Sequence, residues 1–149
     1  ADRRGRSAVL NMVITETGAT KAVGKAVPAL DGKLTGNAVR VPTANVSLAI
    51  LNLSFAKDVG DAKSLNNFVR EVCLHSKLHS QIDFSNSPDA VSTDFVGSRA
   101  AGIFDAQATQ ASGKRATVYV WYDNEFGYSC QVVRILEDMA CVNPPAFPG

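Results

Sequence analysis

The segment Trp121–Tyr128, WYDNEFGY, constrains the fold of this chain more than any other stretch. Four of the five residues before it, in the stretch Ala116–Val120, are β-branched or aromatic, which favours a strand. After it, apolar side chains recur at helical spacing between Cys130 and Val142. The segment itself holds two acids, an amide and a glycine between aromatic rings. A strand that ends in such a turn presents polar groups at the carboxyl end of a sheet, where open α/β sheets tend to bind ligands.

The rest of the chain contains further strand-like and helix-like patterns. Strands are expected at residues 7–14, 37–43, 46–55, 95–106 and 115–122, with a short one within 81–94, and helices at 19–30, 64–75 and 130–142. A polar turn at residues 111–114 indicates a hairpin between the last two strands. Because strands cluster as pairs, we predict an α+β fold: a mostly antiparallel mixed sheet covered by about three helices.

The helical patterns also predict which side chains are buried. The first helix is expected to bury Ala19, Ala22, Val23, Ala26, Val27 and Leu30 and to end at Asp31-Gly32. The second should turn Leu65, Phe68, Val69 and Val72 inward. The third should bury Val132, Ile135, Leu136, Met139 and Val142. In the strand at 37–43, Val39 and Val41 should share one face and Arg40 the other.

Composition excludes several classes of function. A length of 149 residues fits one domain, and a formal net charge of +1 predicts no general affinity for nucleic acid or anionic membranes. No apolar run approaches the roughly 20 residues of a membrane span, and no signal peptide is visible. An odd cysteine count of three favours a reducing, cytoplasmic location. The polar, arginine-rich start without Met suggests a piece of a longer polypeptide.

Several polar residues permit both a structural and a functional interpretation. Thr17 and Gly18 precede a helix, where they could form a cap or an anion site. Arg40 could be a surface charge or a fork for phosphate, and Asn124 and Tyr128 could be ordinary turn and helix-start residues. The i, i+4 pair His75 and His79 lacks an evident third ligand, so we predict no metal site.

Five stretches together resemble the glyceraldehyde-3-phosphate dehydrogenase family. They are Thr17–Lys25, Gly32–Gly36, Arg40–Thr43, Val91–Phe95 and Trp121–Tyr128, and they occur in the family's order. The resemblance runs from about Arg3 to Phe147. It implies that Trp121–Tyr128 ends the last strand of a catalytic domain and opens its C-terminal helix.

The resemblance also implies residue roles. Thr17 and Gly18 would bind the attacking inorganic phosphate, and Arg40 would lie between that site and the site for the substrate's terminal phosphate. Asn124 would bond the carboxamide of the nicotinamide ring, and Tyr128 would pack beside the ring. Glu125 could support this turn, and Arg3 could help at the substrate phosphate. Ala100 departs from the His usual in close relatives, without consequence for this interpretation.

In this family a cysteine thiolate attacks an aldehyde phosphate, a histidine takes the proton, NAD accepts hydride, and phosphate releases an acyl phosphate. The family's cysteine, histidine and Rossmann domain would precede Ala1, so residues 1–149 would form most of a catalytic domain without its start. No catalytic residue is expected in the chain, and the isolated chain should be inactive. NAD is the expected cofactor, with NADP left open, and the full-length enzyme is expected to be a homotetramer.

Two other functions remain open at this point. An erythrose-4-phosphate dehydrogenase would use the same Arg40 but release its product with water, so it would not require phosphate. A phosphate-binding or assembly module without chemistry would lack an upstream nucleotide-binding domain. The intact Thr17-Gly18 pair and the full Tyr122–Tyr128 segment favour the phosphorylating enzyme.

Overall fold

The computed structural model describes residues 10–142, which divide into two compact units at Ala44/Asn45. The first unit contains β1 (Val13–Glu16), α1 (Ala19–Ala26), the 3-10 turn η2 (Pro28–Leu30) and β2 (Asn37–Arg40). β1 and β2 are antiparallel, with Val13 opposite Arg40 and Glu16 opposite Asn37. The two-stranded ladder therefore places the start of α1 at one end and Arg40 at the other.

Helix α1 is shorter than its apolar pattern predicts. It ends at Ala26, and the following Val27 leaves the helical region at φ −127° and ψ 83°. Pro28 is the cause, because the proline ring disfavours helical geometry in the residue before it. Leu30 belongs to η2 instead, and Asp31-Gly32 follows that turn rather than closing α1. Val23, Val27 and Leu30 are all exposed, so the predicted buried face is wrong.

The second unit is built on a four-stranded sheet with the order β3-β6-β5-β4. Its strands are β3 (Ser47–Ser54), β4 (Ile82–Ser85), β5 (Gly102–Ser112) and β6 (Arg115–Tyr122). Only the β4–β5 pair of this sheet is parallel. This mixed, mostly antiparallel sheet, with three α-helices in the described chain, confirms the predicted α+β class. The hairpin between β5 and β6 is confirmed, but β5 begins at Gly102 because η3 (Ser92–Phe95) and a turn precede it.

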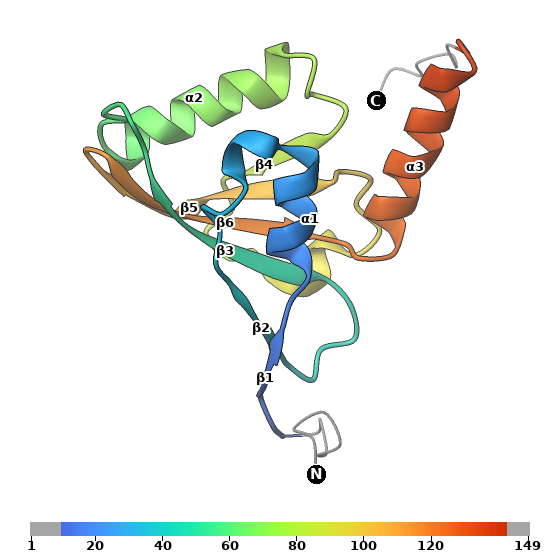
Figure 1. The fold of residues 1–149 in the computed structure, drawn as a ribbon, viewed down its shortest axis with the longest axis horizontal. Coiled ribbons are helices and arrows are strands. Elements are labelled where there is room, and N and C mark those ends of the chain that lie inside the picture. Colours follow the sequence, from blue (N-terminus) through green and yellow to red (C-terminus); the bar gives the residue numbers. More distant parts are fainter. Residues whose placement is uncertain (1–9, 143–149) are drawn as a thin grey trace. The chain divides into compact units, whose positions relative to one another are not determined.

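Helix α2 (Ala62–His75) supplies the helical side of the core. Figure 1 shows α2 in green alongside the sheet, and Leu65 packs with Phe104, Ala106, Ala116 and Val118. The helix begins where the Asp61 carboxylate accepts a hydrogen bond from the Ser64 N–H, at 2.8 Å. Phe68 was expected inside but is 67% exposed. The buried stripe of α2 runs through Leu65, Val69 and Cys73, at steps of four, and Phe68 falls beside it.

Helix α3 (Phe126–Met139) behaves differently from α2. It continues from the end of β6 and stands apart from α2 at the right of Figure 1, and Gly127 is its buried residue. The predicted inward residues Val132, Ile135, Leu136, Met139 and Val142 are all exposed. The helix is therefore correct and its predicted burial is wrong, because no element among residues 45–142 covers this face. None of the helices that the structure describes is long and apolar enough to cross a membrane.

Candidate functional site

Asp123 is the centre of the turn between β6 and α3. Its Oδ1 accepts hydrogen bonds from the N–H groups of Glu125 and Phe126, both at 2.8 Å. Its Oδ2 accepts from the Gly97 N–H at 2.9 Å and from Asn45 Nδ2 at 3.1 Å. One carboxylate thus joins the start of α3, the loop after η3 and the residues before β3. The residue is 3% exposed, so these four donors replace the water that would otherwise solvate its carboxylate.

The same bonds keep Asp123 ionised. Hydrogen bonds from the Gly97 and Phe126 N–H groups lower the pKa of Asp123 from 3.8 to about 2, against the opposing effect of burial. A negative charge here is also favoured by the helix dipole, because Phe126 begins α3. The turn is consequently held by a charged group throughout the neutral pH range.

Asn124 and Tyr128 lie on the outside of this turn. Asn124 Oδ1 accepts a hydrogen bond from Ser47 Oγ at 2.7 Å, and its amide NH₂ group has no partner among residues 45–142. Tyr128 lies in the first turn of α3 and is 70% exposed. The turn therefore presents a free amide donor and, four residues on, an exposed aromatic ring.

Two further contacts fix the turn at its ends. The Trp121 indole N–H donates to Asp105 Oδ2 at 3.0 Å, and its ring stacks on Phe95 with centroids 5.4 Å apart. At the other end, a Cβ on Gly127 would lie 2.6 Å from the Ala100 carbonyl oxygen. A side chain at Gly127 is therefore excluded, since α3 begins in direct contact with the loop at residues 98–100.

Sequence reasoning did not find the roles of Asp123, Asp105 and Ser47. An acid just before a helical pattern is a recognisable cap signal for Asp123. Ser47 had no such signal, because its partner Asn124 is 77 residues away in the chain. The β3–β6 register, which sets Ser47 opposite Tyr122, brings the two together.

Thr17 and Gly18 lie between β1 and α1, as predicted. Gly18 is the cap residue of α1, and Thr17 Oγ1 accepts a hydrogen bond from the Ala19 N–H at 3.2 Å. The cap residue Gly18 itself makes no side-chain cap hydrogen bond, so the Thr17 hydroxyl supplies a local contact one residue before the cap. A Cβ on Gly18 would meet nothing within 4 Å, so the space in front of this turn is open.

Arg40 ends β2 at the opposite end of the ladder. It pairs with Val13, three residues before Glu16, so its backbone is about 10 Å along the strands from the level of Glu16, the residue before Thr17. Within residues 10–44 its guanidinium makes no hydrogen bond or ion pair, and the residue is exposed. Within these residues the Arg40 guanidinium is thus unpaired, and no contact joins it to Thr17. Arg3 lies outside the described residues.

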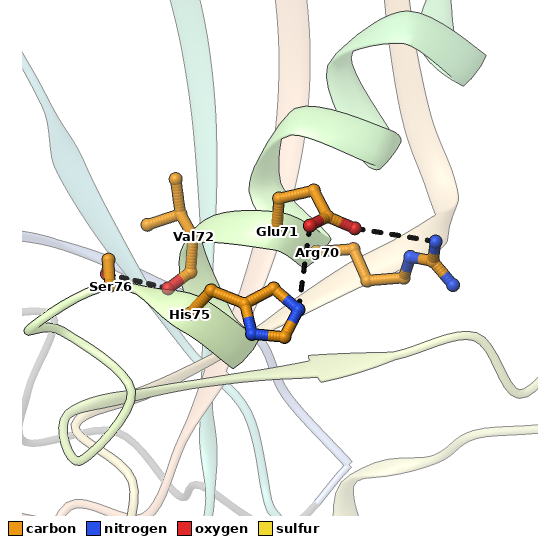
Figure 2. A network of polar contacts seen from close by, with 5 residues as sticks. All are labelled: Arg70, Glu71, Val72, His75 and Ser76. Carbon is orange, nitrogen blue, oxygen red and sulfur yellow. Dashed lines mark hydrogen bonds and ion pairs between the residues drawn. The ribbon is translucent and has the colours of Figure 1, made fainter.

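The two histidines do not share a helix face. Figure 2 shows His75 and Arg70 approaching the Glu71 carboxylate, each at 3.6 Å, on the exposed side of α2. The helix ends at His75, and His79 Nδ1 lies beyond it, 2.9 Å from the Ser76 carbonyl oxygen. Over residues 10–142, no group of three or more His, Cys, Asp or Glu side chains is arranged to hold a metal ion.

The three cysteines lie in α2, in α3 and beyond α3, and Cys130 follows Tyr128 by two residues. Cys73 is buried in α2, Cys130 is partly buried in α3, and Cys141 is exposed beyond α3. Burial, and then the charge of Asp83, raise the pKa of the Cys73 thiol, which disfavours its reactive thiolate form.

Comparison with known proteins assigns the chain. Residues 1–124 match the profile described as "Glyceraldehyde 3-phosphate dehydrogenase, C-terminal domain". A glyceraldehyde-3-phosphate dehydrogenase-like protein of Pseudomonas aeruginosa (strain UCBPP-PA14) is 64% identical over 98% of this chain and 32% of its own length. The glyceraldehyde-3-phosphate dehydrogenase of Kitasatospora aureofaciens is 39% identical over 93% of this chain and 41% of its own length. The cytosolic glyceraldehyde-3-phosphate dehydrogenase of Craterostigma plantagineum is 42% identical over 93% of this chain and 40% of its own length.

This chain therefore spans between a third and about two fifths of the length of these relatives. The matches extend over nearly all of its own residues, including the turn that Asp123 holds. The chain belongs to the glyceraldehyde-3-phosphate dehydrogenase C-terminal domain family.

Proposed function

We propose that this chain is part of an NAD-dependent, phosphorylating glyceraldehyde-3-phosphate dehydrogenase of glycolysis and gluconeogenesis. In that enzyme it supplies phosphate binding, nicotinamide orientation and subunit contacts. Family membership supports the oxidoreductase class. The observation that carries the finer proposal is the turn held by Asp123, which presents the free amide donor of Asn124 beside the start of α3.

The residues of this turn fit a nicotinamide ring. The Asn124 NH₂ group, which has no partner among residues 45–142, can donate to the oxygen of the ring's carboxamide. Tyr128 presents an exposed aromatic face that can pack beside the ring. When bound, NAD supplies a hydride acceptor, and these two side chains determine which face of the ring meets the substrate.

The first unit fits anions rather than a ring. The Thr17 hydroxyl and the N–H groups that open α1 can donate to inorganic phosphate, where the helix dipole also favours negative charge. Arg40 offers a paired-donor guanidinium that no acid within residues 10–44 neutralises. Together they would hold inorganic phosphate and the terminal phosphate of the aldehyde substrate.

The groups that break and make bonds come from elsewhere in the polypeptide. Cys73 is buried with a raised pKa, and no hydrogen bond within residues 10–142 joins a histidine to any of the three cysteines. A nucleophilic cysteine, its histidine base and the nucleotide-binding domain would precede this segment. We expect a cytoplasmic homotetramer for the whole enzyme and no activity for residues 1–149 alone.

The test uses the polypeptide that joins this chain to a nucleotide-binding domain. Replacing Asn124 with Ala removes the donor to the carboxamide, so the KM for NAD should rise about 5- to 150-fold, the range for an orphaned buried partner. Asn67→Ala, at an exposed amide on α2, is the matched control and should leave that KM unchanged. An unchanged KM in Asn124→Ala refutes the nicotinamide assignment.

The product distinguishes the phosphorylating reaction from the hydrolytic reaction of an erythrose-4-phosphate dehydrogenase. With glyceraldehyde 3-phosphate and NAD, the enzyme should require phosphate and form an acyl phosphate. Turnover without phosphate that yields a free acid would instead indicate the erythrose-4-phosphate type. NAD reduction by residues 1–149 alone would contradict the proposal that the nucleophile lies outside them.

A further inference from the structure

The Asn124 side chain is held by one hydrogen bond, and that bond has a direction. Ser47 Oγ donates to Asn124 Oδ1 at 2.7 Å, the sole hydrogen bond of this side chain within residues 45–142. A carboxamide presents an oxygen on one side and an NH₂ group on the other, and a half turn about its last bond exchanges them. Because Ser47 occupies the oxygen, the NH₂ group is the end that remains for a ligand.

The position of Ser47 is set by the residues just before it, whose backbone is strained and held by hydrogen bonds. The residue before it, Val46, has φ +69°, a left-handed conformation that is rare for a β-branched residue. Val46 is 7% exposed, and its N–H donates to Asn45 Oδ1 at 2.7 Å. Strain of this kind persists where the surroundings enforce it, and it concentrates at functional sites.

The anchor of this strained segment is Asp123. Asn45 Nδ2 donates to Asp123 Oδ2 at 3.1 Å, so the residue before Val46 is tied to the residue before Asn124. Asp123, Asn45, Val46 and Ser47 thereby form a closed path that returns to Asn124 through the Ser47 hydroxyl. Both ends of the Ser47–Asn124 bond are consequently fixed by the same carboxylate.

From this geometry we infer that Ser47 is a positioning residue for the cofactor. It sets the Asn124 carboxamide with its NH₂ group outward, so that the site selects a ligand with a carbonyl acceptor at the ring's 3-position. This inference rests on the proposed function of the same turn. It adds the group that determines which end of Asn124 meets the nicotinamide.

The orientation of the Asn124 carboxamide can be tested with analogues of NAD that differ at the ring's 3-position. The 3-acetylpyridine analogue of NAD keeps the carbonyl oxygen and lacks the amide nitrogen, whereas the thionicotinamide analogue replaces the oxygen with sulfur, a weaker acceptor. An outward NH₂ group should favour the acetylpyridine analogue over the thionicotinamide analogue in kcat/KM. An Asn124 that can rotate should lose part of this preference, since it can also offer its oxygen to the thioamide NH₂.

The experiment compares three variants in the full polypeptide. In Ser47→Ala, the KM for NAD should rise about 2- to 13-fold, the range for one neutral hydrogen bond, and the preference between the two analogues should shrink by a similar factor. Ser47→Thr keeps the hydroxyl and should retain the wild-type preference. Ser54→Ala, at an exposed serine on the same strand, should change neither quantity.

A change at Asn124 separates this inference from the proposed function. Asn124→Asp keeps an acceptor for Ser47 and removes the outward donor, so it should lose as much NAD affinity as Asn124→Ala. If both Asn124 variants bind NAD normally, the proposed function fails. If they lose affinity while Ser47→Ala keeps the wild-type analogue preference, the role of Ser47 alone is refuted.

Discussion

The two parts of the chain that carry candidate residues, one in each unit, are built in opposite ways. In the turn at Trp121–Tyr128, Asp123 accepts four hydrogen bonds, and Ser47 Oγ donates a hydrogen bond to Asn124 Oδ1. In the first unit, Thr17 Oγ1 accepts one hydrogen bond, from the Ala19 N–H, and the Arg40 side chain makes none within residues 10–44. One part is organised by this chain, and the other is open.

The difference reflects the ligands that each part is proposed to bind. A neutral carboxamide is recognised by direction, so its partner must be held in one orientation before binding. An anion is recognised mainly by charge, which acts over a longer range and tolerates a mobile guanidinium. We therefore expect ligands to change the first unit more than the turn.

The largest expected effect is at Arg40. Arg40→Leu in the full enzyme should weaken binding of the phosphate-bearing substrate by about 2–5 kcal/mol, because an anion then loses its charged partner. Steady-state kinetics with glyceraldehyde 3-phosphate and with inorganic phosphate measure this loss. Arg70→Leu removes an exposed arginine of α2 and is the control. Equal affinities in the two variants would show that Arg40 is not an anion-binding residue.

Acid should weaken the turn that Asp123 holds. The pKa of Asp123 is lowered to about 2 in the folded chain from 3.8, so its contribution to stability is present above pH 4 and is lost as pH falls towards 2. Asp123→Asn should accordingly be less stable than the wild type at pH 6, and the gap should narrow towards pH 2. Unfolding followed by Trp121 fluorescence at a series of pH values measures it. A gap independent of pH would contradict the role given to the charge.

A smaller effect is expected at Thr17. Thr17→Val removes the acceptor for the Ala19 N–H and should cost about 0.5–1 kcal/mol of unfolding free energy, at the low end for a helix cap. It should also abolish the protection that phosphate gives to the amides of residues 17–20 in hydrogen exchange. The amides of residues 123–126 serve as the internal control and should be insensitive to phosphate. Protection of both sets by phosphate would remove the contrast between the two parts.

The smallest effect is expected in the polar network of Figure 2. Glu71→Gln breaks the contacts with Arg70 and His75, which are more than half exposed. The unfolding free energy should change by less than about 1 kcal/mol, since water screens such pairs. Chemical denaturation measures this change. A larger loss would mean that α2 depends on its outer surface as well as on Leu65.

The fold was predictable where local patterns and tertiary packing agree. Alternation and β-branched residues predict β3 and β6, and both are present. Helix α2 buries Leu65 as its pattern indicates, whereas α3, with an equally clear pattern, leaves Leu136 58% exposed. Periodicity shows that a helix has an apolar face, but not which part of a polypeptide covers it. Helix α1 is shorter than predicted for a local reason, because Pro28 disfavours helical geometry at Val27.

The site was predictable only in part, for a similar reason. Asn124 and Tyr128 are recognisable from a contiguous motif, and the turn that carries them is present. The Ser47–Asn124 bond depends on strand pairing between residues far apart in the chain, and the strain at Val46 depends on burial. Neither feature can be predicted from a short stretch of sequence. The sequence therefore predicts the recognition residues better than the residues that hold them in position.

The most direct test of this account is a crystal structure of the full polypeptide with and without NAD. We predict that Asn124 Nδ2 lies within about 3.2 Å of the carboxamide oxygen of the nicotinamide, while Ser47 Oγ still donates to Asn124 Oδ1. The four hydrogen bonds of Asp123 should be the same in both states. A turn that rearranges when NAD binds, or an Asn124 amide directed away from the ring, would contradict a preformed nicotinamide site.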